Sequence, residues 1–134
     1  MMFNVCLFYP NLINSINFFI KKMDFGKVAA LNLLSMTVMG AMGGHKTTWE
    51  PQQVRHFGTA QLYHLVMSVG MFMSASVPTN IAYRKYCFGL FMIGNFCFVA
   101  PMYYRAWTQK APYPGMGPFG GICAMMGFAG LALL

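Results

Sequence analysis

The chain has 134 residues, of which 57% are hydrophobic and only 8% are charged. This balance lies far outside that of soluble domains and predicts a membrane protein with one domain at most. Two carboxylates, Asp24 and Glu50, stand against nine Lys and Arg, which leaves no pair of acids for catalysis of the glycosidase kind. We therefore expect no enzymatic activity.

The net charge of +7 comes from basic residues that stand singly or in pairs between long apolar runs. Nucleic-acid binding calls for a basic patch interleaved with polar surface, so we expect no nucleic-acid partner. Lys and Arg that flank apolar segments instead reach lipid headgroups. The predicted partners are the lipid bilayer, including an anionic lipid such as cardiolipin, and other integral membrane subunits.

Residues 1–27 are predicted to be an N-terminal extension, either interfacial or flexible. Its first 22 residues scatter Asn among Phe, Ile and Leu, which makes a poor membrane span, and they lack the Arg of a transit peptide and the basic start of a secretory signal. One alternative is an amphipathic interfacial helix from Leu12 to Lys22. The other is that the bias reflects AT-rich coding and that Met23 is the true start.

Four apolar segments without Lys, Arg, Asp or Glu follow within residues 28–134, at about 28–44, 57–77, 86–104 and 118–134. Segments of this length are typical of membrane-spanning helices. They predict an all-α integral membrane protein, an antiparallel four-helix bundle. Gly43 and Gly44 are expected to stop the first helix by adopting the left-handed conformation, and Pro78 is expected to stop the second.

Small and polar residues in these segments predict how the helices pack. In the last segment, residues at three- or four-residue steps form a small-residue stripe that allows close helix contact: Gly117, Gly121, Ala124, Gly127 and Gly130. Asn95 lies near the middle of the third segment and is expected to bond to another helix. The four cysteines form no Cys-x-x-Cys pair and are expected to be buried free thiols.

Antiparallel packing would bring four short motifs to one membrane face: GAMGGH after the first segment, Tyr63 and His64 in the second, FVAPMYY at the end of the third, and GPFGG at the start of the fourth. The motif residues are Gly40, Ala41, Gly43 and His45, then Ala60 and Tyr63, then Phe98 and Tyr103, and finally Pro118, Gly120 and Gly121.

From Val28 onward the chain resembles a small four-helix membrane-protein family of unknown function, of the transmembrane protein 256 type, which carries these motifs in this order. Two positions depart from the family pattern. Met67 stands where relatives commonly place His, and Phe128 stands where they place Trp. The resemblance implies the four-helix fold and a mitochondrial or bacterial membrane, and it implies no established activity.

Three residues of the motif-bearing face are candidates for binding: His45, His64 and Tyr103. His45 either ligates haem or metal or relays protons, or it caps the end of the first helix. His64 either faces His45 or bonds to Tyr103 or the backbone. The spacing of the three histidines matches no metal site, so we expect no metal and no cofactor. Ligation of haem by two His, or by His and Met, is an alternative.

The favoured function is that of a non-catalytic accessory subunit in a larger complex of the mitochondrial inner membrane, in the respiratory chain. The alternative is a small membrane protein that binds a small molecule or haem, or handles protons, at the face with His45, His64 and Tyr103.

Overall fold

A computed structural model describes residues 24–78, 80–110 and 115–133. Over these residues the chain is all-helical, which confirms the predicted all-α class. In chain order the elements are α2 (Phe25–Gly44), α3 (Pro51–Ser76), α4 (Ile81–Gly94), the π-helix η1 (Asn95–Val99), α5 (Ala100–Thr108) and α6 (Met116–Ala132). The interfacial helix considered for residues 12–22 lies outside the described residues.

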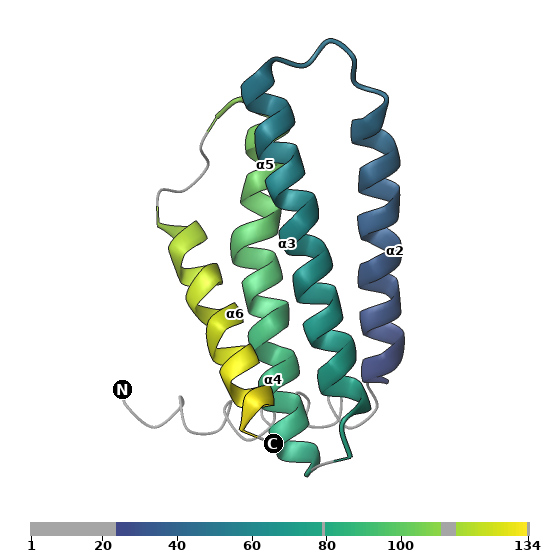
Figure 1. Cartoon of the computed structure of the whole chain (residues 1–134), viewed down its shortest axis with the longest axis vertical. Coiled ribbons are helices and arrows are strands. Elements are labelled where there is room, and N and C mark those ends of the chain that lie inside the picture. Colours follow the sequence, from purple (N-terminus) through teal and green to yellow (C-terminus); the bar gives the residue numbers. More distant parts are fainter. Residues whose placement is uncertain (1–23, 79, 111–114, 134) are drawn as a thin grey trace, which may run out of the picture.

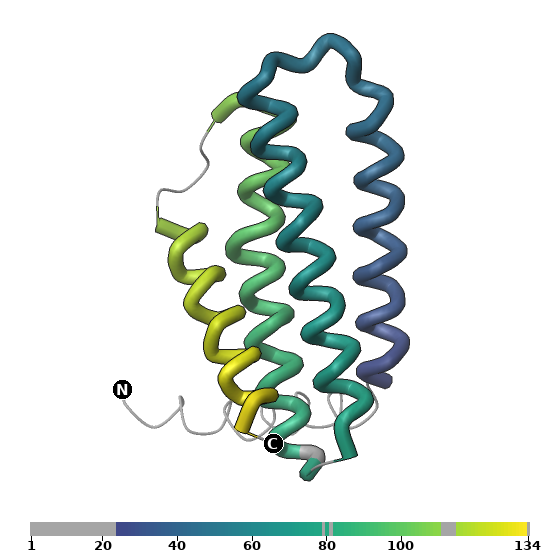
Figure 2. Tube along the Cα trace, viewed as in Figure 1, coloured from purple at the N-terminus to yellow at the C-terminus, as the bar shows by residue number. Residues whose placement is uncertain are grey.

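Helix α3 occupies the centre of the arrangement (Figure 1). It packs against α2 on one side and against α4, η1 and α5 on the other. These last three elements form one continuous rod, which we call the third rod. Helix α6 packs mainly on α4 and η1. Each rod runs opposite to the one before it, and the Cα trace turns back between α2 and α3 through residues 45–50 (Figure 2). Helices α2 and α6 therefore flank the central pair on different sides.

Helix α2 begins at a side-chain cap and ends at His45. The carboxylate of Asp24 accepts hydrogen bonds from the backbone N–H groups of Gly26 and Lys27, at 3.1 and 3.3 Å. These are two of the donors that a helix leaves free in its first turn. At the other end, the backbone N–H of His45 bonds to the carbonyl of Gly43, as the capping alternative for His45 expected.

Helix α2 ends at Gly44, as predicted, but the left-handed conformation expected of Gly43 and Gly44 was wrong. Both lie within α2, and a positive φ occurs among the described residues only at Gln109 and Gly115. Gly43 is needed for packing instead, because a Cβ there would lie 2.1 Å from Cζ of Phe57. The missing side chain lets the aromatic ring of α3 rest against the backbone of α2.

Helix α3 ends where the sequence predicts. Its last residue is Ser76, and Val77 caps it, because the ring of Pro78 disfavours helical backbone in the residue before it. Helix α4 then starts at Ile81 and is capped by Asn80, whose side chain accepts a hydrogen bond from the N–H of Ala82 at 3.0 Å. The short connection between α3 and α4 forces the two helices to run in opposite directions side by side.

A π-turn interrupts the third rod at Asn95–Val99. Pro101 has no N–H to give to the carbonyl of Cys97 four residues earlier, so an ordinary α-helical ladder is broken there. A π-turn holds one extra residue per turn and changes which side chains face each neighbour. Its result is that Val99 is buried, whereas Phe96 is 74% exposed.

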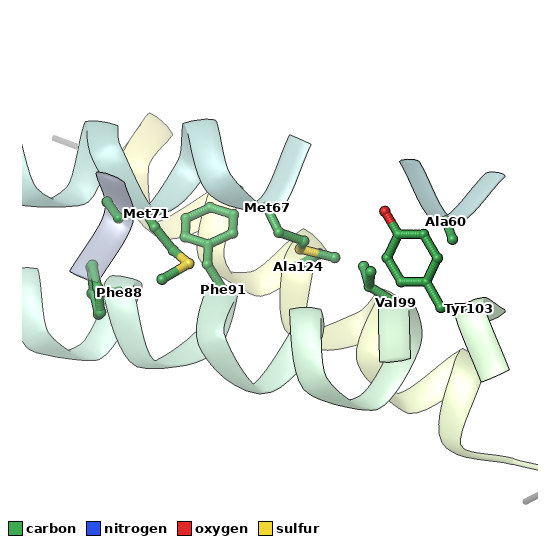
Figure 3. Close-up of a cluster of buried hydrophobic side chains, with 9 residues drawn as sticks. Ala60, Met67, Met71, Phe88, Phe91, Val99, Tyr103 and Ala124 are labelled. Atoms are coloured by element: carbon green, nitrogen blue, oxygen red, sulfur yellow. The ribbon is translucent and has the colours of Figure 1, made fainter. Parts of the chain in front are cut away.

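The buried apolar core follows the contact of α3 with the third rod (Figure 3). The ring of Phe91 lies between Met67 and Met71 (Figure 3). Two glycines make room for this ring, since a Cβ at Gly70 would lie 2.5 Å from it and a Cβ at Gly127 would lie 2.9 Å from it. Glycine on α3 and α6 thus lets three helices close around one aromatic side chain.

The small-residue stripe on α6 matches the predicted one at Ala124, Gly127 and Gly130, which are buried. Its buried members are Gly120, Cys123, Ala124, Gly127 and Gly130. A Cβ at Gly121 would meet nothing within 4 Å. Gly120 and Cys123 join the stripe near its N-terminal end, whereas the predicted Gly121 faces open space and Gly117 is half-buried next to Phe98. Cys87 and Cys123 are buried free thiols, as expected, and Cys97 is free and half-buried.

Candidate functional site

Neutral polar side chains from α2, α3, η1 and α5 form a hydrogen-bond network between the helices. We call it the polar network. Its members are Asn32, Ser35, Gln61, His64, Ser68, Asn95 and Tyr103. His64, Ser68 and Tyr103 are buried, and the others are half-buried or, for Ser35, exposed. Buried polar groups are expensive unless paired, so these bonds fix how the helices fit together.

The network starts at Tyr103, on α5. Its hydroxyl accepts a hydrogen bond from Nε2 of Gln61 at 2.7 Å, and the same amide group also donates to the carbonyl of Met36 on α2 at 3.3 Å. The hydroxyl oxygen of Tyr103 lies 3.3 Å from Nδ1 of His64. Since its own hydrogen is still available, Tyr103 donates it to Nδ1. The predicted bond between His64 and Tyr103 is confirmed.

The partner on α2 decides the tautomer of His64, because Oδ1 of Asn32 can only accept a hydrogen bond from Nε2. With Nδ1 acting as acceptor, the neutral ring carries its proton on Nε2. That nitrogen lies 3.3 Å from Oδ1 of Asn32 and 3.3 Å from Oγ of Ser35, two acceptors on α2. His64, on α3, therefore accepts a hydrogen bond from Tyr103 on α5 and donates one to α2, so that a directed chain of hydrogen bonds joins the three helices.

Asn32 is the centre of the network. Its Nδ2 donates to Oγ of Ser68 at 2.7 Å, and its Oδ1 accepts from Nδ2 of Asn95 at 2.8 Å. The hydroxyl of Ser68 donates in turn to the carbonyl of His64 at 2.7 Å. The expected partner of Asn95 on another helix is thus Asn32. One atom of the network is left over: Oδ1 of Asn95 is buried and has no hydrogen-bond partner among the residues that the structure describes.

Sequence reasoning missed four members of the network: Asn32, Ser35, Gln61 and Ser68. A signal for them exists. Gln61, His64 and Ser68 follow one another at steps of three and four residues, as do Asn32 and Ser35 at a step of three, so each set lies on one face of its helix. Two polar faces in neighbouring apolar segments indicate that the faces meet.

The family motifs, which we predicted at one membrane face, form two separate packing groups in the described residues. One group joins α2, α3 and α5 and contains Gly43 and Tyr103, which both contact Phe57. A second group joins α3, η1 and α6, where the rings of Tyr63 and Phe98 lie 4.4 Å apart. The two groups are separate because α2 and α6 flank the central helices on different sides.

The second group also contains Gly120. A Cβ at Gly120 would lie 2.8 Å from the backbone N of Phe98 and 3.0 Å from the carbonyl oxygen of Gly94. Here the backbones of α6 and η1 touch. The remaining motif residues differ in surroundings: Ala60 is buried, Gly40 packs on the side chain of Gln61, and Ala41 and Pro118 are exposed.

His45 lies apart from the network. Its side chain is exposed in the turn after α2, and its role in the described structure is the backbone cap at Gly43. The alternative in which His64 faces His45 is replaced by the bonds of His64 to Tyr103 and Asn32. Of the three candidate residues, the structure brings only His64 and Tyr103 together.

A groove of about 580 Å³ runs beside the network, between α2 and the third rod. It is mostly apolar, and the polar residues among its lining are Asn32, Ser35 and Asn95. The groove exists because α2 packs chiefly on α3 and contacts the third rod little. It is a concave site of the size that small-molecule ligands use.

Aromatic rings and cationic side chains gather at the end of the molecule near the turn after α2. The rings of Trp49, Phe57 and Trp107 pack edge to face within 5.2 to 5.6 Å of one another. A small pocket of about 50 Å³ nearby is lined in part by His56 and Arg105. Burial, together with Arg105 and Arg55, lowers the pKa of His56. Aromatic rings and exposed cations are typical of the boundary between a bilayer and water.

The arrangement does not favour a metal or haem. Over the described ranges, no three His, Cys, Asp or Glu side chains gather into a metal-binding group. Both ring nitrogens of His64 lie within 3.3 Å of hydrogen-bond partners, so neither is free for iron. The chemistry that the network does offer is neutral hydrogen bonding next to an apolar groove.

The fold and this site define an all-helical protein in which two helices, Phe25–Gly44 and Ala82–Thr108, are long and apolar enough to cross a membrane. Residues 39–121 match the family described as a protein of unknown function (DUF423), and the chain belongs to this family. This confirms the suspected family of unknown function. Neither curated proteins nor solved structures gave a match.

Proposed function

We propose that this chain is an integral, multi-pass membrane protein, with its helices as an antiparallel four-helix bundle. The observation that carries this proposal is the distribution of polarity. Large apolar side chains face outward on every long helix, among them Leu31 at 64% exposed and Leu34 at 59%, whereas the polar network lies inside. In water so large an apolar surface would be a liability, but in lipid it is the expected arrangement.

The lengths support the same proposal. Helix α2 has 20 residues, and at about 1.5 Å per residue it spans about 30 Å, the thickness of the hydrocarbon core. Helix α3 is less apolar in sequence because it carries the inward polar residues. Exposed cations at the helix ends, such as Lys27 and Arg55, suit anionic headgroups, including those of cardiolipin.

Alkaline carbonate extraction tests the membrane proposal. Membranes from cells that express the chain are washed at high pH, which removes peripheral proteins and leaves integral ones. We expect the protein to stay in the pellet and to be released only by detergent. Recovery in the carbonate supernatant would overturn the proposal.

Within the membrane, we propose a non-catalytic accessory subunit of a larger mitochondrial inner-membrane complex, in the respiratory chain. Uncovered glycines support it: a Cβ at Gly58, Gly89 or Gly121 would meet nothing within 4 Å. Glycine on an outer helix face lets the helix of another subunit approach closely. The mitochondrial location is supported by the family resemblance alone.

Native gel electrophoresis tests the subunit proposal. Mitochondria are solubilised with a mild detergent, resolved on a native gel and probed for the chain. We expect migration with a large complex, together with its other subunits. Migration only as a free small protein would contradict it.

A second candidate function is the binding of a small molecule, or the handling of protons, at the polar network. The observation that favours it is the directed hydrogen-bond chain through Tyr103, His64 and Asn32, which ends beside the groove. Haem is the weaker version of this proposal, since the nitrogens of His64 are engaged.

Tyr103→Phe is expected to weaken any such activity and to lower the free energy of unfolding by about 1–2 kcal/mol, because the amide of Gln61 and Nδ1 of His64 lose their partner. His45→Ala is the control. It is expected to change neither the activity nor the free energy of unfolding, since the side chain of His45 is exposed. Unfolding in mixed detergent micelles measures the stability. A larger loss for His45→Ala than for Tyr103→Phe would refute the assignment.

A further inference from the structure

The residues that line the groove between α2 and the third rod indicate which class of ligand it could bind. Its apolar walls come from residues such as Leu31, Ile93 and Phe96, and the polar residues among its lining are Asn32, Ser35 and Asn95. Within the described ranges, no Lys, Arg, Asp, Glu or His lines the groove. A ligand that fits these walls is therefore uncharged and largely apolar, with its polar part at one place.

The hydrogen-bond balance of the network defines the polar part of that ligand. Two donors beside the groove already have partners: Nδ2 of Asn95 donates one of its two hydrogens to Asn32, and Ser35 gives its hydroxyl to the carbonyl of Asn32 at 2.7 Å. The group without a partner is an acceptor, Oδ1 of Asn95. A buried acceptor without a donor is costly, by about 1–3 kcal/mol. A ligand that satisfies it must donate a hydrogen bond.

The position of Asn95 supports a binding role as well. It is the first residue of the π-turn, and such turns occur frequently at functional sites. The turn places Asn95 against α2 and, two residues later, Cys97 in the wall of the same groove. Because Oδ1 is shielded, a donor in the groove reaches it only when the Asn95 amide rotates about its soft terminal torsion. This rotation gives up the 2.8 Å bond from Nδ2 of Asn95 to Asn32, and the bond to the ligand replaces it.

We propose that the groove binds an uncharged lipid that carries a free hydroxyl group, with the hydroxyl donating to Oδ1 of Asn95 and the apolar body lying along Leu31, Ile93 and Phe96. This inference rests on the membrane proposal and gives a ligand class to the second candidate function. The lipid enters sideways from the bilayer, since the groove opens on the apolar surface. Diacylglycerols, sterols and isoprenoid hydroquinones share this chemistry.

Photo-crosslinking in nanodiscs tests the proposal. The full chain is reconstituted in phosphatidylcholine with a diazirine-bearing diacylglycerol, irradiated, and mapped by mass spectrometry. We expect labelling in residues 28–35 and 92–97. Unlabelled dioleoylglycerol should suppress this labelling about five- to tenfold better than its O-methyl ether, which cannot donate. Cholesterol and ubiquinol, each against its own methyl ether, identify which hydroxyl lipid binds best.

Three variants sharpen the test. Ile93→Trp fills the groove without touching the network and should abolish the labelling, whereas Ile122→Trp, equally exposed on α6, should leave it intact. Asn95→Leu should remove the preference for the alcohol over the ether. Equal competition by alcohol and ether, or equal labelling of α6, would show annular lipid only and overturn the inference. Failure of the membrane proposal is distinct, because the chain would then not enter the nanodisc.

Discussion

Gly120→Ala is expected to lower the free energy of unfolding by about 1–3 kcal/mol, the usual range for overpacking a tight contact. The added Cβ would lie 2.8 Å from the backbone N of Phe98 and 3.0 Å from the carbonyl oxygen of Gly94. Backbone atoms cannot turn aside as a flexible side chain can, so α6 must move away from η1. This separation also weakens the contact at Gly127.

The neighbouring glycine is a matched control. Gly121→Ala places a methyl group in open space, and alanine is a better helix former than glycine by about 1 kcal/mol, so this variant should be neutral or more stable. Both variants are unfolded in mixed micelles and followed by circular dichroism. Equal effects at the two positions would contradict the described packing, in which Gly120 contacts the backbone of η1 and Gly121 faces open space.

Asn32→Leu is expected to destabilise the protein by about 2–3 kcal/mol, because it leaves several polar groups in the interior without partners. Oγ of Ser68 loses its donor, and Nδ2 of Asn95 loses its acceptor. The control is Thr37→Val on the same helix. The hydroxyl of Thr37 bonds only to the carbonyl of Leu33 in its own helix, so its removal should change stability little.

A double-mutant cycle separates the stabilisation due to the Asn32–Asn95 bond from the effect that each substitution has on helix propensity. If Asn32 and Asn95 act through their shared bond, the effect of replacing both by Leu should be smaller than the sum of the single effects. The same micelle unfolding assay measures all four proteins. Additive effects would mean that the 2.8 Å bond contributes nothing to stability.

The sequence predicted the class of fold because that class depends on local properties. Long uncharged apolar runs make helices, Pro78 ends one of them, and Asn95 in such a run needs a partner wherever it lies. The family resemblance could also be recognised from short motifs in order. None of these inferences requires knowledge of which helices touch.

What the sequence left open depends on how each helix is rotated and which neighbours it meets. Gly43 is expected as a helix stop from its residue type, but its role is set by the ring of Phe57 on another helix. On α6, Gly120 makes the helix contact expected of Gly121 for the same reason. A single step along a helix turns a side chain by about 100°, and periodicity alone does not fix that angle.

The sequence by itself therefore determined an all-helical, apolar chain of a known family, since composition and spacing set those features. Only the tertiary structure decided that Asn32 is the partner of Asn95, that His64 bonds to Tyr103 and not to His45, and that the motifs divide into two groups. These pairings join residues as many as 63 positions apart. They arise when three helices pack together, because only then do their polar faces come within hydrogen-bonding distance.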